Sequence, residues 1–394
     1  MRRETAALYL ATIACYADMY LTQPVLPELS REFGVAPAQA GLTVSAVVLA
    51  IAAASTLYGA LSDALGRRRV MVASAALLVV PTLACAFAPS FRALLALRAL
   101  QGAFIPGVTA VSVAYAGDRW PPDRLTRVVA GIMGAAVAGG LLGRVMAGPV
   151  TAAFGWRATF LVGAAVTAVA AAGLARELGP APARQPLALH SAWAGVMGHL
   201  REPRLLGAFL IGASLFFGWM GLFTFLPYHL TSGRYRLPTA LVSSVYLVYT
   251  AGVVASPMAG RLAQRFPPRA VMAAGLAAGA CGAALTLAGP LPVVLAGLVV
   301  FVGGAYTAQA VAPSFVNASA RVAKGGANAL YLSFYYVGGT LGSSLPGLAW
   351  QRWRWPGVVV ICFAALAAAL AADGLLCGRP LRALRPQNAS SKAR

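Results

Sequence analysis

Charged side chains, and acidic ones above all, are scarce in this sequence. Ten of its 394 residues are Asp or Glu. Charged residues make up 10% of the chain, whereas a soluble domain has about 25%. Hydrophobic residues make up 59%. This composition excludes an ordinary soluble globular protein and indicates a membrane protein.

Cysteine and histidine are too few and too scattered for several common kinds of site. The five cysteines lie singly in apolar segments without a C-x-x-C pair, so neither a disulfide framework nor a metal site is predicted. The three histidines form no H-E-x-x-H pattern, which argues against a membrane-embedded enzyme. Because no G-x-x-x-x-G-K-[ST] motif occurs, ATP-driven transport by this chain alone is not expected. We expect no cofactor.

The net charge of +21 comes from basic residues that are scattered between apolar runs. A nucleic-acid partner is therefore not expected, because such partners are bound by basic residues gathered on one face. Of the 31 Lys and Arg residues, Arg98 and Arg144 lie inside predicted spans, and the others divide 22 against 7 between alternate sides of the apolar runs. The excess of positive charge marks the cytoplasmic side and places both termini there. We predict a multi-pass protein of the inner (cytoplasmic) membrane.

Twelve apolar segments have about the 20 residues that a spanning helix needs. They are predicted near residues 5–28, 39–61, 70–88, 92–115, 125–148, 157–176, 204–229, 239–260, 270–288, 291–316, 328–350 and 357–377.

An internal repeat sets the expected architecture. The stretch from Gly59 to Met71 aligns with the stretch from Gly260 to Met272. We therefore predict an all-α membrane protein whose twelve helices form two pseudo-symmetric six-helix bundles. The predicted units are an N-terminal bundle over 1–176, a cytoplasmic linker over 177–203, a C-terminal bundle over 204–378 and a basic cytoplasmic tail over 379–394. Within the linker, Leu189, Trp193, Val196, Met197 and Leu200 share one helical face, so it forms either a short interfacial helix or a partly ordered connection.

Two motifs carry a resemblance to a known family. The loop Gly59-x-Leu61-Ser62-Asp63-x-x-Gly66-Arg67-Arg68 resembles the motif between helices 2 and 3 of the major facilitator superfamily. The run Leu94-x-x-x-Arg98-x-x-Gln101-Gly102 resembles the fourth-helix motif of the proton-coupled drug antiporters in that superfamily. The runs from Gln23 to Pro27 and from Tyr331 to Tyr336 are similar to the YnfM-like bacterial transporters, an efflux group.

The resemblance implies a secondary active transporter, not an enzyme, that moves a small organic molecule by alternating access. Proton-coupled efflux is the first expectation, and proton-coupled uptake or passive facilitation on the same fold are the alternatives. The expected partners are a small-molecule substrate, protons and the lipid bilayer, with a monomer as the expected unit. The fifth helix departs from the G-P-x-x-G-G signature of such antiporters, since Gly139-Gly140-Leu141-Leu142-Gly143-Arg144 has Gly for Pro and Arg for the last Gly.

Three ionisable residues lie deep in apolar sequence, where a charge is expensive and usually functional. Asp18 is the one acid placed well inside a predicted span, and Arg98 falls at a similar depth. We expect the two side chains to pair and to couple protons, or else Asp18 to be a structural acid bonded to Thr22 or to a neighbouring helix. Arg144 falls near the outer end of its predicted span, so a snorkelling side chain is expected there.

Polar and aromatic residues on the helices that would face a central cavity are the candidates for substrate binding, although packing or interfacial roles are an equal alternative. These candidates are Gln23, Gln101, Trp219, Phe223, Tyr306, Gln309, Tyr331 and Tyr335.

The charged loop and the fifth-helix glycines have other expected roles. Following the resemblance, we expect Gly59, Asp63, Gly66, Arg67 and Arg68 to form a cytoplasmic gate that latches onto the opposite half while the outside is open. Gly139 and Gly143 form a G-x-x-x-G face suited to close helix packing.

Overall fold

The computed structural model describes residues 2–179, 198–320 and 324–378, and every regular element in these ranges is helical. The N-terminal half contains α1 (Arg2–Tyr20), η1 (Gln23–Val25), α2 (Leu26–Phe33), α3 (Pro37–Leu65), α4 (Arg67–Cys85), α5 (Phe91–Arg119), α6 (Pro122–Phe154) and α7 (Trp156–Glu177). The C-terminal half contains α9 (Pro203–Thr231), α10 (Thr239–Val245), η2 (Tyr246–Tyr249), α11 (Thr250–Arg265), α12 (Pro268–Leu285), α13 (Leu291–Ser319), α14 (Lys324–Gly342), α15 (Pro346–Ala372) and η3 (Asp373–Cys377).

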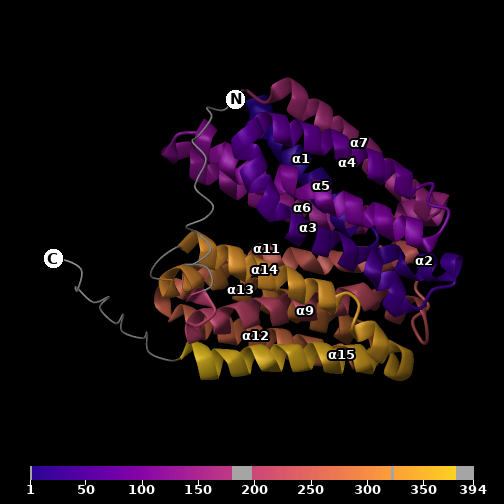
Figure 1. Cartoon of the computed structure of the whole chain (residues 1–394). Helices are drawn as coiled ribbons and strands as arrows, with labels where there is room; N and C mark the ends of the chain where they lie inside the picture. The colour runs from indigo at the N-terminus through magenta and orange to yellow at the C-terminus, as the bar shows by residue number, and fades with distance from the viewer. Residues whose placement is uncertain (1, 180–197, 321–323, 379–394) are drawn as a thin grey trace, which may run out of the picture.

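The two halves lie against one another as two layers of helices (Figure 1). Helices α1 to α7 form one layer and α9 to α15 the other. The start of α1 and the end of α15 lie at one end of the molecule, while α2 lies at the opposite end (Figure 1). By the distribution of Lys and Arg, the end that holds α2 is the outer end.

Among the described residues, ten helices are long and apolar enough to cross a membrane by length and composition. The two predicted spans that this criterion does not include correspond to α1 and α14. The expected class, an all-α multi-pass membrane protein, is confirmed for the part of the chain that the structure describes. The predicted face from Leu189 to Met197 and the predicted tail 379–394 lie outside the described residues.

Several predicted spans have different ends in the structure. The first span, predicted to continue to residue 28, breaks after α1, where a 3₁₀ turn begins at Gln23 and carries Pro24. Proline lacks the N–H that would continue a helix, so the chain restarts there as a new helix. The fifth span, predicted to end at residue 148, continues as α6 to Phe154.

The last two spans also divide differently from the prediction. The span predicted over 328–350 ends in α14 at Gly342, and its remainder opens α15 at Pro346. Within α15 a kink falls at Arg354, whose φ is 50°. Pro356 follows two residues later, and a proline inside a helix removes a backbone hydrogen bond and clashes with the preceding turn.

Glycines allow two tight features in the N-terminal half. Gly66 joins α3 to α4 with φ at 90°, a conformation that L side chains rarely adopt. On α6, a Cβ at Gly139 would collide with the backbone of Ile13, and one at Gly143 would lie 2.5 Å from the carbonyl oxygen of Ala17. The two glycines therefore let α6 approach α1 at backbone distance, which fixes where the side chains of α6 point.

The contacts that join the halves gather at their outer ends. Ser30 Oγ lies 2.6 Å from Tyr228 Oη, and Ser45 Oγ lies 2.6 Å from Ser343 Oγ. Nearer the middle of the membrane, Gln23 Nε2 donates to Thr224 Oγ1 at 3.2 Å. These bonds close the outer side of the space between the two layers.

Candidate functional site: the central cavity and its polar surroundings

A cavity of about 150 Å³ lies between the two halves. Its N-terminal wall comes from α1 and α6 and its C-terminal wall from α9, η2, α13 and α14. The lining residues are Tyr16, Tyr20, Ala136, Val137, Gly140, Arg144, Phe216, Trp219, Met220, Tyr249, Tyr306, Gln309 and Tyr335. Since both halves contribute, motion of one half against the other would change this site directly.

Arg144 lines the cavity and is 2% exposed. Its Nε donates to Gln23 Oε1 at 2.7 Å, and its Nη1 donates to the carbonyl oxygen of Gly140 at 2.7 Å. Its Cζ lies 3.7 Å from the ring centroid of Tyr20 and 4.7 Å from that of Tyr249. The guanidinium thus lies over aromatic ring faces at the cavity wall.

The expectation that Arg144 snorkels to the outer surface is wrong. It depended on a helix end at residue 148, but α6 continues to Phe154, ten residues beyond Arg144. At 1.5 Å per residue this places Arg144 about 15 Å below the end of the helix. A side chain at that depth faces the interior.

Four of the predicted substrate residues line the cavity together: Trp219, Tyr306, Gln309 and Tyr335. Two others contact the lining from behind, because Tyr331 donates a hydrogen bond to Gln309 Oε1 at 3.0 Å and the Phe223 ring lies 4.6 Å from that of Tyr249. Gln23 reaches the site through its bond to Arg144. Gln101 lies elsewhere, in a polar cluster inside the N-terminal half.

Arg98 is the centre of that polar cluster and is fully buried. Its Nη1 donates to the carbonyl oxygen of Asp18 at 2.8 Å and its Nη2 to that of Met19 at 2.8 Å. Because α1 ends at Tyr20, these carbonyls belong to its last turn and have no partner within the helix. The guanidinium supplies the missing donors and is favoured by the negative end of the helix dipole.

The rest of the Arg98 fork binds neighbouring elements. Nε donates to the carbonyl oxygen of Thr43 on α3 at 3.1 Å, and Nη1 also donates to Gln101 Oε1 at 2.8 Å. Gln101 Nε2 in turn donates to Thr82 Oγ1 at 2.8 Å. The cluster therefore ties α1, α3, α4 and α5 together.

The expected pair between the Asp18 carboxylate and Arg98 is not formed, since Arg98 binds the Asp18 backbone instead. The carboxylate points toward α4 and α7, where its Oδ2 accepts hydrogen bonds from Thr167 at 2.8 Å and from Thr82 at 3.3 Å. Its Oδ1 is buried without a hydrogen-bond partner. This geometry matches the alternative expectation, in which Asp18 is hydrogen-bonded to a neighbouring helix. Its partners are Thr82 and Thr167, and not Thr22.

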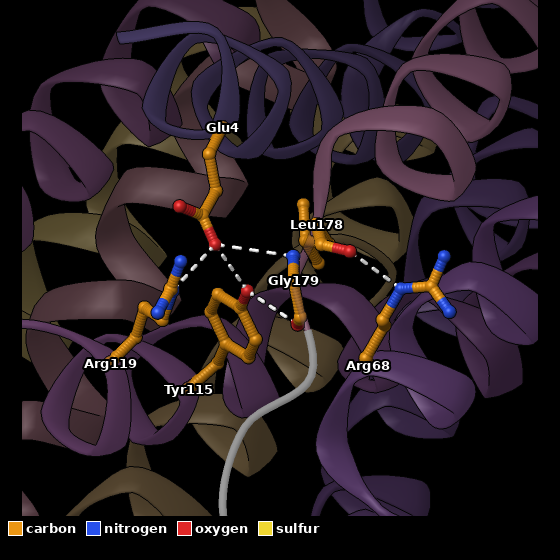
Figure 2. A network of polar contacts seen from close by, with 6 residues as sticks. All are labelled: Glu4, Arg68, Tyr115, Arg119, Leu178 and Gly179. Carbon is orange, nitrogen blue, oxygen red and sulfur yellow. Dashed lines mark hydrogen bonds and ion pairs between the residues drawn. The ribbon is translucent and has the colours of Figure 1, made fainter. Parts of the chain in front are cut away.

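The charged loop between α3 and α4 makes its contacts within the N-terminal half. Arg67 Nε lies 2.8 Å from Asp118 Oδ2, and Arg67 Nη2 lies 3.4 Å from Asp63 Oδ1. Arg68 donates to the carbonyl oxygen of Leu178 at 2.6 Å (Figure 2) and to that of Ala175 at 2.8 Å. With the outer side closed, Arg68 thus holds the end of α7.

A second cytoplasmic cluster, missed in the sequence, surrounds Glu4, which is 3% exposed. Its Oε1 accepts hydrogen bonds from Tyr115 Oη at 2.7 Å, Arg119 Nε at 2.9 Å and the Gly179 backbone N–H at 3.2 Å (Figure 2). Together with Arg68, this cluster fixes the last residues before the predicted linker. The one signal in the sequence is an isolated acid in the basic segment that precedes the first apolar run.

The comparisons with known proteins agree with this architecture. The family model of the major facilitator superfamily matches residues 8–252 and 238–392. The chain is 30% identical over 377 residues to the uncharacterized MFS-type transporter YybF of Bacillus subtilis (strain 168), covering 95% of this chain and 93% of that protein. It is 31% identical to the inner membrane transport protein YnfM of Escherichia coli (strain K12), covering 90% and 86%.

Solved structures share the fold at low sequence identity. A D-xylose-proton symporter superposes with a TM-score of 0.77 at 15% identity, covering 95% of this chain and 97% of that chain. A bacterial homolog of the human lysosomal transporter Spinster, in an inward-facing and occupied conformation, gives a TM-score of 0.79 at 17% identity, covering 94% and 96%. The chain belongs to the major facilitator superfamily. It is a multi-pass transporter of the cytoplasmic membrane and not an enzyme.

Proposed function

We propose that this protein is a secondary active transporter that moves a small organic molecule through the central cavity by alternating access. The observation that carries the proposal is a cavity built from both halves whose outer side is closed by Gln23, Ser30 and Ser45 with their partners. A closed outer side supports an inward-facing state. The rocking units in this proposal are 1–176 and 204–378, joined by 177–203, and the transporting unit is a monomer, because one chain supplies the whole cavity wall.

Proton-coupled efflux is the direction we propose, with Asp18 as the proton carrier. Its Oδ1 has no hydrogen-bond partner, so a proton can be added there without breaking an existing bond. Its other partners come from α4 and α7, and Arg98 holds the backbone of the same residue. A change in the packing of α1 would therefore alter the surroundings of the carboxylate and of Arg98 together.

Transport in vesicles of defined orientation tests this function. In inside-out vesicles with an acidic lumen, antiport predicts that substrate accumulates and dissipates the pH gradient. Symport predicts accumulation in right-side-out vesicles with an acidic exterior, and a facilitator predicts equilibration that ignores the gradient. Failure of a broad panel of drugs, sugars and small acids to cross in any of these arrangements contradicts the proposal.

The role of Asp18 is tested in the same assay with Asp18→Asn. The variant keeps the size of the side chain but cannot exchange a proton, so we expect gradient-driven accumulation to be lost while substrate still equilibrates. Asp123→Asn, at an acid that is largely exposed on the cytoplasmic surface, is the matched control and should keep full coupling. Intact proton-driven transport in Asp18→Asn would remove the coupling role.

The loop from Gly59 to Arg68 is proposed as the cytoplasmic gate of the opposite, outward-open state. In this structure Asp63 lies beside Arg67 of its own half. The proposed contact with the C-terminal half would form when the cytoplasmic ends of the two halves approach each other. Asp63→Asn should favour the inward-open state and raise cytoplasmic labelling of a single cysteine placed at Ala136 in the cavity lining. Unchanged labelling would contradict a gate at this loop.

A further inference from the structure

Arg144 is a buried cation that has no ion-pair partner among the residues that the structure describes. Among the described residues, it is the one charged side chain in the cavity lining, and none of the ion pairs found there includes it. Removing a guanidinium from water is costly unless something compensates its charge. Its present partners are all neutral: the Gln23 amide, the Gly140 carbonyl, the Tyr20 hydroxyl and aromatic ring faces.

The geometry leaves part of the Arg144 fork for a ligand. A guanidinium has five N–H donors in one plane. The bonds to Gln23 and Gly140 use Nε and one N–H of Nη1, and the Tyr20 hydroxyl accepts one more, which leaves two. The Nη1 and Nη2 edge is the one that binds a carboxylate through two parallel hydrogen bonds, and such charge-assisted bonds are stronger than neutral ones. A lysine at this position would offer no such planar fork.

The remaining lining suits an aromatic or otherwise apolar body. The Phe216 and Tyr335 rings stack with centroids 4.0 Å apart, and the Trp219 and Tyr306 rings meet edge to face at 4.8 Å. Flat ring surfaces of this kind bury apolar area and favour offset or edge contacts with another ring. Gln309 adds a polar group for orientation, and a cavity of about 150 Å³ limits the ligand to a small molecule.

We propose that the substrate of this transporter is a small organic anion, with a carboxylate bound by the Arg144 fork and an aromatic body held among Phe216, Trp219 and Tyr335. This inference rests on the proposed function and names the chemical class that the cavity selects. It also excludes a class, because a cationic drug would bring a second positive charge beside Arg144. The acid that could balance such a cation, Asp18, points away from the cavity toward α4 and α7.

The test is equilibrium binding to the purified full-length protein in detergent, measured by titration calorimetry. Three aromatic scaffolds, phenyl, 1-naphthyl and biphenyl-4-yl, are each presented as the carboxylate, the neutral carboxamide and the aminomethyl cation. We expect at least one carboxylate to bind about tenfold or more tightly than its own amide, and the cations to bind most weakly. Carboxylates that bind no better than their amides on all three scaffolds would overturn the proposal.

Variants assign the preference to Arg144. Arg144→Gln should remove the preference for carboxylate over amide, whereas Arg157→Gln, at a half-exposed arginine near the outer surface, should keep it. Arg144→Lys preserves the charge without the planar fork, so we expect an intermediate preference for carboxylate over amide. This variant replaces Arg144→Gln in the test if the Gln variant does not fold. A preference that survives unchanged in either Arg144 variant would contradict the assignment.

The outcomes for binding and for transport are separate. If carboxylates bind selectively but nothing crosses the membrane in vesicles, the anion site stands and the proposed function fails. If uncharged or cationic compounds are transported and carboxylates do not bind, the function stands and the anion proposal fails.

Discussion

Arg98 and Arg144 are both almost fully buried in apolar sequence, yet they have opposite surroundings. Arg98 is enclosed by carbonyl and amide oxygens of its own half. Arg144 faces a cavity shared by both halves and lies over tyrosine rings. An arginine whose donors are used by the backbone stabilises the fold, while one with donors left over at a cavity is suited to bind a ligand.

The first and largest expected effect concerns Arg98. Arg98→Lys keeps the charge, but an ammonium with three donors on a shorter side chain cannot reproduce the bonds of the guanidinium to the carbonyls of Asp18, Met19 and Thr43. Each buried carbonyl left without a donor costs about 1–3 kcal/mol. We expect a low folded yield and the largest fall in Tm of any variant discussed here, measured by thermal unfolding in detergent. Arg92→Lys, at an exposed position of the same helix, should leave Tm unchanged.

An unaltered Tm in Arg98→Lys would contradict the structural role of Arg98. It would mean that the carbonyls at the end of α1 find other donors, so that Arg98 is free for a different role.

The second effect tests how Arg144 is placed. Gly139→Ala puts a Cβ into the backbone of Ile13, and overpacking of this kind costs about 1–3 kcal/mol. We expect a lower Tm and weaker ligand binding, because α6 must move away from α1 and carries Arg144 with it. Gly134→Ala on the same helix, where a Cβ meets nothing within 4 Å, is the matched control and should be neutral.

The third effect concerns the link from Arg144 to the other half. Gln23→Ala removes the bonds to Arg144 and Thr224, and a hydrogen bond of this kind contributes about 0.5–1.5 kcal/mol. We expect the outward-open population to rise about two- to tenfold, seen as faster labelling from outside of a single cysteine placed at Ala136. Gln39→Ala, whose amide bonds within its own half, should not change the rate.

Labelling of the Ala136 cysteine that stays as slow in Gln23→Ala as in the parent would show that the outer closure does not depend on this bridge. Arg144 would then differ from Arg98 only in the N–H groups that it leaves for a ligand.

The smallest effect concerns an exposed arginine, Arg157, beside Glu32 on the outer surface. Burial raises the pKa of Glu32, but hydrogen bonds from Trp156 and Arg157 outweigh it and hold the pKa below the ordinary value of 4.5. The resulting stabilisation is therefore present above the pKa of the unfolded state and is lost as the pH falls through the lower pKa of the folded state. Solvent screening keeps such an exposed pair at about 0–1 kcal/mol.

The check is Tm measured from neutral pH to below pH 4. In Glu32→Gln we expect Tm to fall slightly less than in the wild type as the pH is lowered. At neutral pH the Tm of the variant should differ little from that of the wild type. A fall in Tm at neutral pH as large as that of Arg98→Lys would contradict the ranking of buried over exposed arginines.

The fold class could be predicted because it depends on signals along the chain. These signals are the lengths of the apolar segments, the distribution of Lys and Arg, and the repeat that begins at Gly59. Each is a local or periodic property of the sequence. The glycine turn at Gly66 and the small face of α6 follow from the same kind of local rule.

The contents of the site could be predicted less well, because they depend on where helices end and which way side chains point. The break of α1 at Tyr20 exposes the carbonyls that Arg98 binds, and no apolar count reveals that break. The extension of α6 to Phe154 places Arg144 in the cavity, whereas the apparent end of the apolar run placed it at the surface. The Glu4 cluster brings together residues more than a hundred positions apart.

A double-mutant cycle shows whether Arg144 recognises the negative charge of the substrate. The affinities of wild type and Arg144→Gln are measured for 1-naphthoate and for 1-naphthamide. We expect the substitution to weaken naphthoate binding by about tenfold or more, which is about 1.4 kcal/mol of coupling, and to leave naphthamide binding nearly unchanged. An equal loss for both compounds would show that Arg144 shapes the cavity without recognising the charge, and that the anion proposal is wrong.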